Sequence, residues 1–190
     1  MIDLLELGDF LDPATCEKIR GELRAAAASA ATVIGGQREG SVEPRVRNTS
    51  RLVVPSELAE RFTRRLVSRQ AELERHFGIA LTECEIPQFL RYEKGDFFVP
   101  HQDGNTSLIF DDSRFRRVSV VVSLSSWSAQ PEPGTYDGGA LVVHGPHAIP
   151  SGRVRLTPSP GTLIAFRAET THEVTPVTRG ERYTIVSWFR

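Results

Sequence analysis

Three residues in the second half of the chain could together hold a metal ion. His101 and Asp103 are separated by a single residue at the end of an expected β-strand, and in an extended chain the side chains of residues i and i+2 point to the same face. An imidazole and a carboxylate can therefore converge there, and His172, in the β-rich run HEVTPV, is the natural third ligand. Two histidines and one carboxylate on one face of an octahedron hold Fe(II) in oxygenases and leave positions for oxygen and a chelating co-substrate.

Arg182 is a candidate anion-binding residue. It follows His172 by ten residues, in the β-run GERYTIVSWF, which we expect to pair beside the His172 strand. Taken alone it could equally be a surface charge at the start of a strand. If buried it needs a partner, and its planar fork of donors suits a carboxylate, each such charged hydrogen bond contributing about 1.5–3 kcal/mol. A dicarboxylate such as 2-oxoglutarate would fit, with its keto acid on the iron and its distal carboxylate on Arg182.

Two helices are expected before these residues. Asp12 can accept hydrogen bonds from the first-turn amides and Pro13 fits the first helical position, so ATCEKIRGELRAAAAS is predicted to be helical, with Ile19 and Leu23 on its buried face. A second helix is predicted from Ser56 to about Phe77, ended by Gly78. The segment between the two helices is rich in Gly, Pro and polar residues and is expected to be loop or edge strand.

From residue 86 onward, short β-rich runs alternate with Gly and Pro: IPQFLRY, RVSVVVSL, ALVVH, TLIAF, HEVTPV and RYTIVSWF. Several such strands after two helices predict an α+β, mainly β fold, an antiparallel double-sheet jelly roll of the cupin-like kind with the N-terminal helices packed on one sheet. We expect a single domain over 1–190, with helical support over 1–80 and the jelly-roll core over 84–190. Segments 104–117 and 125–139 are long enough to be lids or variable surface loops.

These motifs resemble those of the prolyl 4-hydroxylase-like branch of the 2-oxoglutarate/Fe(II) dioxygenases, over nearly the whole chain. FLDPATCEKIR is similar to the family's opening helix, and VRNTS to the segment before its long helix. FLRYEKGDFFVPHQD resembles its metal strand and DGGALVV its hairpin strand. PSPGTLIAF and HEVTPVTRGERYTIVSWF resemble its closing metal and co-substrate strands. The last of these motifs are specific.

The resemblance implies a double-stranded β-helix that binds Fe(II) through His101, Asp103 and His172 and pairs the carboxylate of 2-oxoglutarate with Arg182. It also implies that Tyr92 lies near the co-substrate, although a packing aromatic would explain Tyr92 almost as well. O2 would be consumed, and ascorbate could serve as a reductant. The chain departs from the family at two positions. At Ser123 some relatives carry a tyrosine that also contacts the distal carboxylate, and at Val186 some carry a polar side chain.

Composition narrows the classes of partner. The formal charge is −1 and basic residues are interspersed with acidic ones, so we expect no nucleic acid partner. No apolar stretch approaches the roughly 18 residues that cross a bilayer, and no signal peptide is evident, which favours a cytoplasmic protein without membrane contact. Cys16 and Cys84 have no CxxC neighbour and are expected to be plain core or surface residues. The oligomeric state is not predicted.

Several further side chains have two interpretations. His144 and His147 could be read as a second metal site, but we expect solvent-exposed loop histidines. His76 would be a favourable charge at a helix C-terminus. Trp127 and Tyr136 could close over substrate. Four arginines could form a positive rim for an acidic or carboxylate-bearing substrate, although solvated surface positions would explain them as well: Arg47, Arg114, Arg116 and Arg117.

The predicted function is hydroxylation coupled to decarboxylation of 2-oxoglutarate, with a prolyl or other residue of a protein or peptide as the favoured substrate. Hydroxylation of a free amino acid or small metabolite is the alternative, because a fold does not fix a substrate. A nucleic-acid demethylase is less favoured, since a second arginine after Arg182 is lacking. A non-enzymatic cupin-like metal-binding or sensor module is a further alternative, which Arg182 argues against.

Overall fold

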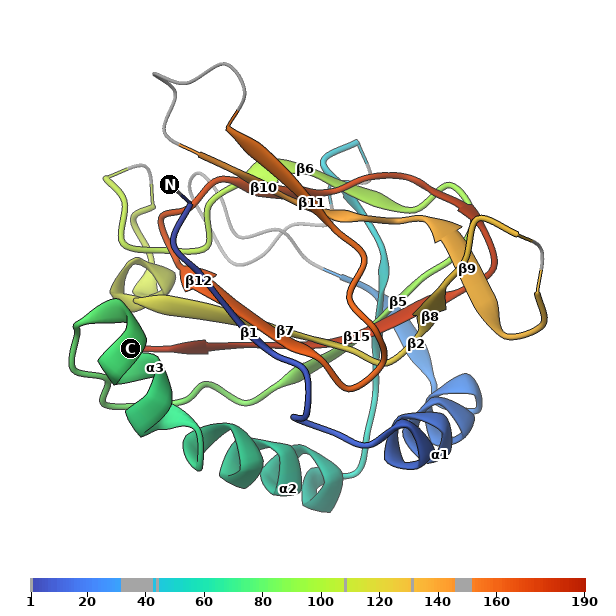
Figure 1. The fold of residues 1–190 in the computed structure, drawn as a ribbon, viewed down its shortest axis with the longest axis horizontal. Coiled ribbons are helices and arrows are strands. Elements are labelled where there is room, and N and C mark those ends of the chain that lie inside the picture. The colour runs from blue at the N-terminus through green and yellow to red at the C-terminus, as the bar shows by residue number, and fades with distance from the viewer. Residues whose placement is uncertain (1, 32–42, 44, 108, 131, 146–151) are drawn as a thin grey trace.

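The computed structural model describes residues 2–31, 43, 45–107, 109–130, 132–145 and 152–190. In this part of the chain two β-sheets face each other, and helices cover the outer face of the larger one (Figure 1). The helices are α1 (Pro13–Arg24), α2 (Ser56–Val67) and α3 (Gln70–Phe77), with one 3-10 turn at Asp112–Phe115. None of these helices has the length and apolarity that crossing a bilayer requires.

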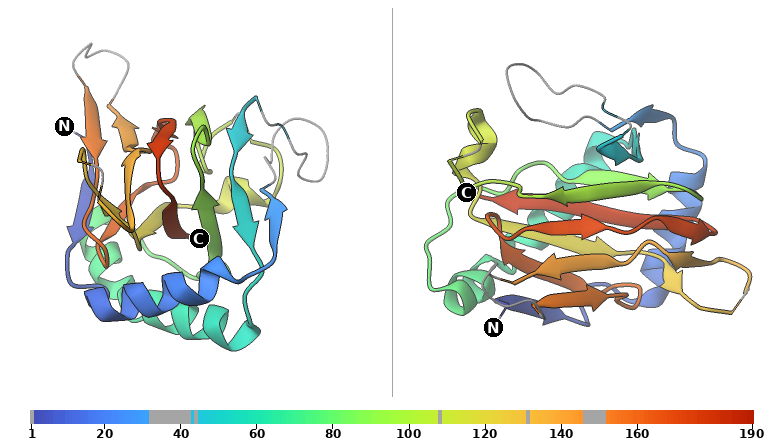
Figure 2. Two further views of the ribbon diagram at one scale, coloured as in Figure 1. Left: turned by 90° about the vertical axis from the view of Figure 1, so that its right-hand side faces the viewer. Right: turned by 90° about the horizontal axis from the view of Figure 1, so that it is seen from above.

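The larger sheet has seven antiparallel strands, and Figure 2 shows how the two sheets stack. Its order is β1 (Leu4–Leu7), β12 (Leu163–Arg167), β7 (Val118–Ser123), β15 (Arg182–Phe189), β5 (Gln88–Tyr92), β4 (Ser50–Leu52) and β2 (Ala28–Ala30). The second sheet has the order β11 (Arg153–Leu156), β10 (Leu141–His144), β13 (His172–Val174), β6 (Phe97–His101) and β3 (Arg47–Asn48). A small sheet is formed by β14 (Val177–Arg179), β9 (Thr135–Gly138) and β8 (Ser126–Trp127).

The main hydrophobic core lies between the helices and the seven-stranded sheet. Ile19 and Leu23 of α1 and Phe62 of α2 are buried in it against side chains of β5, β7 and β15. Cys16 is also buried there, and Cys84 packs against the same core. The jelly roll with its helices on one sheet is therefore confirmed.

A second, smaller apolar region fills the space between the two sheets. Successive side chains of a strand point to opposite faces of the sheet, so every other residue of β7 and β15 faces the second sheet while its neighbours face the helices. The inward apolar residues form two clusters, one around Val121, Leu141 and Phe166 and one around Leu90 and Val174. Polar side chains that interrupt these clusters stand out as candidates for function.

The helices differ from the prediction at two places. The expected helix from Ser56 to Phe77 is broken in two, because Ser68 closes α2 with its hydroxyl on the Arg65 carbonyl and α3 starts afresh at Gln70. The first helix ends at Arg24, and Ala28–Ala30 pairs with Ser50–Leu52 as strand β2. Pairing with a sheet edge thus overrides the helix propensity of the alanines. The predicted ends at Asp12 and at Gly78, which has φ +63, are confirmed.

The strands also differ from the prediction. HEVTPV is divided between β13 and β14, which belong to different sheets, and the expected pairing of the Arg182 strand with the His172 strand is wrong. β15 instead pairs with β5 and β7, so Arg182 and His172 approach each other from opposite sheets. Segment 125–139 holds two short strands, β8 and β9, and the first 80 residues supply strands β1 to β4 as well as the helices.

Candidate active site

A cluster of His101, Asp103 and His172 lies between the two sheets. β6 ends at His101, which is the cross-strand partner of His172 on β13. Asp103 follows after the strand, where its amide donates to the Ala168 carbonyl. The Asp103 carboxylate oxygens lie 3.6 Å from His101 Nε2 and 3.4 Å from His172 Nε2, and the potential ligand atoms of the three residues lie within 4.8 Å of one another. These distances allow one metal ion to be held by all three side chains.

Both imidazoles are oriented by the backbone. His101 Nδ1 lies 2.8 Å from the Val99 carbonyl oxygen, and His172 Nδ1 lies 2.9 Å from the Thr170 carbonyl oxygen, each two residues earlier in the chain. Because a carbonyl can only accept, each Nδ1 carries the proton and each Nε2 keeps a free lone pair. This hydrogen bond to the far ring nitrogen is the usual way to fix the tautomer of a metal-binding histidine.

Aromatic rings hold the same imidazoles from the side. The Phe98 ring stacks on His101 with 3.5 Å between centroids and 14° between planes, and the Phe166 ring lies 4.6 Å from that of His172. The Arg47 guanidinium lies over the outer side of Phe98, 4.8 Å from its centroid. Packing of this kind restricts the side-chain rotamers, so the two ring nitrogens are positioned before a metal arrives.

Asp103 and His172 have the protonation states that metal binding needs. Burial and, to a smaller extent, the neighbouring His101 lower the pKa of His172 to about 4 against the opposing effect of Asp103, so its imidazole is neutral at pH 7. Burial alone would raise the pKa of Asp103, but the two imidazoles and the Ser119 hydroxyl hold it well below the usual range. The Ser119 hydroxyl donates to Asp103 Oδ2 at 2.7 Å and adds to the stabilisation of the ionised carboxylate.

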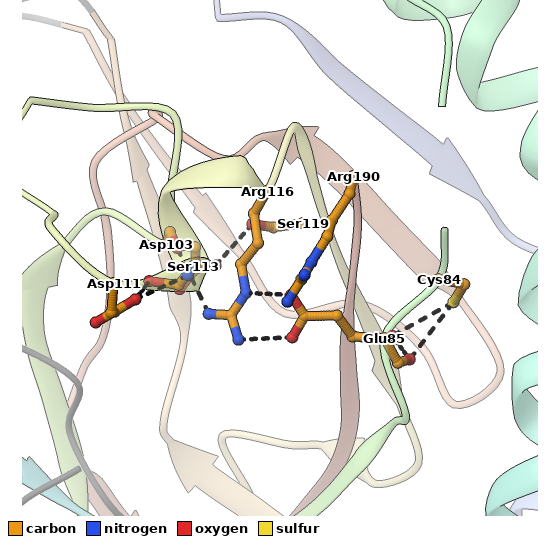
Figure 3. Close-up of polar contacts among 9 residues, drawn as sticks. Cys84, Glu85, Asp103, Asp111, Ser113, Arg116, Ser119 and Arg190 are labelled. Atoms are coloured by element: carbon orange, nitrogen blue, oxygen red, sulfur yellow. Dashed lines mark hydrogen bonds and ion pairs between the residues drawn. The ribbon is translucent and has the colours of Figure 1, made fainter. Parts of the chain in front are cut away.

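A buried arginine connects this cluster with the end of the seven-stranded sheet (Figure 3). Arg116 makes two hydrogen bonds to the Glu85 carboxylate, of 2.9 and 2.7 Å, and its remaining nitrogen points to the Asp103 carbonyl oxygen at 3.5 Å. Arg190 also pairs with Glu85, at 3.1 Å, and the Arg116 guanidinium lies 3.7 Å from the Trp188 ring centroid. Arg116 is therefore a structural residue, and its expected place in a positive rim is wrong.

Arg182 lies in the same cavity and is only 3% exposed. Tyr92 is its cross-strand partner on β5, and the guanidinium lies 5.1 Å from the Tyr92 ring centroid. Among the described residues no carboxylate lies within ion-pairing distance of Arg182. A buried guanidinium that faces a cavity, with no acidic partner in the described part of the chain, has the chemistry that suits an anion.

The close approach of the chain to Arg182 explains why a glycine follows Gly138 at this end of the cavity. Gly139 has φ +54, a backbone conformation that favours glycine. A Cβ at this position would lie 2.8 Å from Val177 Cγ2 and 3.1 Å from Arg182 Cδ. The motif therefore lets the hairpin pass closely against the aliphatic part of Arg182 and helps to fix its direction.

The cavity gathers polar groups from both sheets within apolar walls. Its polar and aromatic lining includes the metal-ligand cluster together with Arg47, Tyr92, Phe98, Ser119, Arg182, Thr184 and Trp188. Its apolar lining consists of Leu90, Val120, Val121, Leu141, Val174 and Val186. The five residues singled out from the sequence are all here. Ser119 and Thr184 escaped sequence analysis, because a hydroxyl in an apolar run has no distinguishing spacing.

Several other expectations have mixed outcomes. His144 ends β10 and pairs with Glu173 at 2.9 Å, with a side chain only 12% exposed, so the expected solvent-exposed loop histidine is wrong. His147 lies outside the described residues. His76 is in the last turn of α3, as expected, and lies 3.2 Å from Asp3. Tyr136 is buried outside the cavity lining and cannot close over a substrate, because it packs beside Gly139.

Of the remaining rim candidates, Arg47 lines the cavity, whereas Arg114 and Arg117 are exposed at the surface. The Arg114 guanidinium lies over the Phe115 ring, and Arg117 donates to the Asn105 side chain at 3.2 Å. Trp127 is 38% exposed. A contact of these residues with substrate stays a prediction.

Comparison with known proteins agrees with this geometry. The sequence pattern of the 2OG-Fe(II) oxygenase superfamily matches residues 87–190. A PKHD-type hydroxylase of Bordetella pertussis is 31% identical over 98% of this chain and 78% of its own length. The chain belongs to the 2OG-Fe(II) oxygenase superfamily. A PKHD-type hydroxylase of Acidovorax ebreus is 28% identical over 88% of this chain and 70% of its own length.

Solved structures show the same fold as this oxygenase. A prolyl-4-hydroxylase of Pseudomonas putida has a TM-score of 0.72 and 23% identity, covering 100% of this chain and 93% of that protein. A prolyl hydroxylase of Trichoplax adhaerens, solved with a peptide fragment of the hypoxia inducible factor oxygen degradation domain, has a TM-score of 0.69 and 18% identity. The match covers 98% of this chain and 83% of the Trichoplax protein.

Membership of this family confirms that the chain is an Fe(II)- and 2-oxoglutarate-dependent dioxygenase of the prolyl 4-hydroxylase-like kind, which uses O2. The residues present fit these groups. Two imidazoles and one ionised carboxylate are a donor set for Fe(II) with open positions. The unpaired guanidinium of Arg182 suits a carboxylate, which a metal-binding or sensor module without a co-substrate would not need.

Proposed function

We propose that this dioxygenase hydroxylates a residue of a protein or peptide, with a prolyl residue as the first candidate. The observation that carries the proposal is the cavity in which a His-Asp-His cluster and an unpaired arginine face each other from opposite sheets. The PKHD-type hydroxylases among its relatives support hydroxylation. The peptide held by the Trichoplax enzyme supports a protein or peptide substrate over a free amino acid or small metabolite.

In this proposal each of the five cavity residues has a defined role. His101 and His172 bind Fe(II) through Nε2, and Asp103 binds it through a carboxylate oxygen. Arg182 pairs with the distal carboxylate of 2-oxoglutarate. Tyr92 supports the guanidinium from below and contacts the co-substrate. The placement of the metal ligands on one sheet and Arg182 on the other supports these roles, because a molecule with an acid at each end can span the cavity between them.

The bound iron, together with 2-oxoglutarate and O2, supplies the oxidation of a substrate C–H bond. The chain's own contribution is positional. The backbone carbonyls of Val99 and Thr170 aim the imidazoles, and Ser119 holds Asp103 in one orientation. The apolar walls exclude water from the inner part of the cavity, which strengthens the pairing of Arg182 with an acid.

The first test is an anaerobic titration of Fe(II)-loaded protein with 2-oxoglutarate, followed by admission of O2. We expect a weak visible charge-transfer band that decays as succinate forms. Asp103→Ala and His172→Ala are expected to lose iron and activity. Arg182→Ala is expected to keep iron but to need far more 2-oxoglutarate, because a hydrogen-bonded charge is lost. Arg64→Ala, on the exposed face of α2, is the matched control and is expected to behave as wild type.

Substrate class is tested by incubating the active enzyme with proline-containing peptides and with free amino acids, and by measuring the gain of one oxygen atom by mass spectrometry. Oxygen gained by peptides supports the proposal, and oxygen gained by free amino acids alone would overturn the peptide assignment. Unchanged turnover in Asp103→Ala or His172→Ala would remove the metal assignment. An unaltered affinity for 2-oxoglutarate in Arg182→Ala would remove Arg182 from the site.

A further inference from the structure

The three proposed metal ligands come from two segments that lie far apart in the chain. His101 ends β6 and Asp103 follows it, whereas His172 starts β13 directly after the turn at 168–171. Strand pairing places His172 opposite His101. Asp103 lies beyond the end of the strand, so its distance from His172 depends on contacts between segment 102–105 and this turn.

Backbone hydrogen bonds provide one of these contacts. The amides of Asp103 and Gly104 both donate to the Ala168 carbonyl oxygen, at 2.9 and 3.1 Å. Because both bonds end on the same atom, they let the segment pivot about it. A second point of contact is needed to fix the angle at which Asp103 approaches His172.

Two side chains provide that second contact, one before Asp103 and one after it. Gln102 Nε2 donates to the Glu169 carbonyl oxygen at 2.7 Å, and Asn105 Nδ2 donates to the Glu169 carboxylate at 3.0 Å. The oxygen of the Asn105 amide accepts a hydrogen bond from Arg117 at 3.2 Å. Both side chains therefore bind the same residue of the turn that precedes β13.

Both residues are held at a local cost in energy. Asn105 has φ +50 and is the only non-glycine residue with a positive φ in the described part of the chain, a conformation that glycine adopts more readily than asparagine. The Gln102 Oε1 atom is buried without a hydrogen-bond partner among the described residues, which is also unfavourable. A glycine at position 105 and a leucine at position 102 would avoid these costs. The hydrogen bonds to Glu169 are therefore the best explanation for the two amides.

We propose that Gln102 and Asn105 are positioning residues for the metal site. They fix the spacing of Asp103 and His172, whose Oδ2 and Nε2 atoms lie 3.4 Å apart. The inference rests on the proposed role of these two residues as iron ligands. The turn that the amides hold also orients the His172 ring, because the Thr170 carbonyl lies against its Nδ1. A shift of the turn would therefore move one ligand with respect to the other, and residues that orient ligands in this way raise metal affinity.

The test measures Fe(II) affinity by anaerobic competition with a chelator, and ligand geometry from the visible absorption of Co(II)-loaded protein. Gln102→Leu removes one hydrogen bond to Glu169. Asn105→Gly removes the other and keeps a residue suited to the positive φ. We expect each variant to bind Fe(II) roughly tenfold more weakly, and the double variant more weakly still. The Co(II) absorption bands are expected to shift in both variants, because the ligands change their relative positions.

Gln70→Leu is the matched control for Gln102→Leu. Gln70 Nε2 also donates to a backbone carbonyl at 2.7 Å, that of Leu81, but it lies on α3, on the outer side of the seven-stranded sheet. This variant is expected to melt at a lower temperature while its Fe(II) affinity and Co(II) spectrum stay those of wild type. The same result in Gln102→Leu and Asn105→Gly would show that their amides only stabilise the fold, and it would overturn the proposal.

A second pair of variants decides if either substitution prevents folding. Glu169→Gln keeps an acceptor for Asn105 Nδ2, whereas Glu169→Ala removes it, and the backbone carbonyl that Gln102 contacts is present in both. We expect Glu169→Gln to bind Fe(II) nearly as wild type does and Glu169→Ala to bind it roughly tenfold more weakly. Equal affinities in this pair would overturn the proposal.

The failure of this inference is distinguishable from the failure of the proposed metal site. If Asp103→Ala loses iron while Gln102→Leu and Asn105→Gly bind it as wild type does, the ligands stand and the positioning role is refuted. If Asp103→Ala keeps iron, the ligand assignment fails and the positioning role fails with it.

Discussion

Replacing Ser119 by alanine tests whether metal affinity depends on a residue that touches no metal. The Ser119 hydroxyl donates to Asp103 Oδ2 at 2.7 Å, and both residues are largely buried, so water cannot replace the lost donor well. A hydrogen bond to a charged group contributes about 1.5–3 kcal/mol to stability.

We expect Ser119→Ala to bind Fe(II) roughly 10- to 100-fold more weakly, the usual effect of removing a hydrogen bond to a metal ligand. The assay is an anaerobic competition for Fe(II) against a chromogenic chelator of known affinity. Ser119→Thr keeps the hydroxyl and is expected to keep most of the affinity.

Ser187→Ala provides the matched control for this substitution. Ser187 is also buried, on the neighbouring strand β15, but its hydroxyl donates to the Glu85 backbone carbonyl at 2.6 Å. This variant is expected to lose about 1 kcal/mol of stability and to keep its iron affinity. An iron affinity of Ser119→Ala equal to that of Ser187→Ala would refute the reasoning, because the hydrogen bond to Asp103 would then have no influence on the metal.

Two further substitutions test the surroundings of the site. Glu85→Gln breaks the paired carboxylate beneath Arg116 and is expected to cost about 3 kcal/mol at pH 7. Burial alone would raise the pKa of Glu85, but the hydrogen bonds and charges of Arg116 and Arg190 outweigh it and lower the pKa below the ordinary 4.5. The contribution of the ionised Glu85 to folding stability is therefore present above pH 4.5 and is lost as the pH falls further. Chemical denaturation across this range should show the two proteins converging in acid, and a gap that widened there would contradict the assignment. Gly139→Ala places a Cβ against Arg182 Cδ and is expected to lower both stability, by about 1 kcal/mol or more, and affinity for 2-oxoglutarate. Gly134→Ala has the same kind of backbone strain, with φ +75, but open space around it, so it should lose stability alone; equal loss of affinity in both variants would show that contact with Arg182 is irrelevant.

The cavity residues could be predicted from the sequence because their spacing repeats the geometry of strands. His101 and Asp103 are two residues apart, and His172 and Arg182 each start a run of strand-forming residues. Such a pattern tells which face of a strand is buried, but it does not tell which strand is its neighbour. The partner of β15 was therefore predicted wrongly although the residues that face the cavity were not.

The remaining differences come from contacts between distant parts of the chain. Ala28–Ala30 has the composition of a helix, and only its pairing with β4, some twenty residues later, makes it a strand. The break at Ser68 lets α3 turn its own apolar face to the core. Ser119 acquires its importance from Asp103, which lies outside its strand, and the local sequence around Ser119 holds no sign of it.

The hydrogen bonds from the two imidazoles to Val99 and Thr170 have a consequence for how the enzyme tolerates change. Their acceptors are main-chain carbonyls, so no substitution of the side chain at 99 or 170 can delete them. The direction of both ring nitrogens is therefore set by the path of the strands alone. The side chains at these two positions can therefore change during evolution while the backbone keeps the direction of both histidine rings.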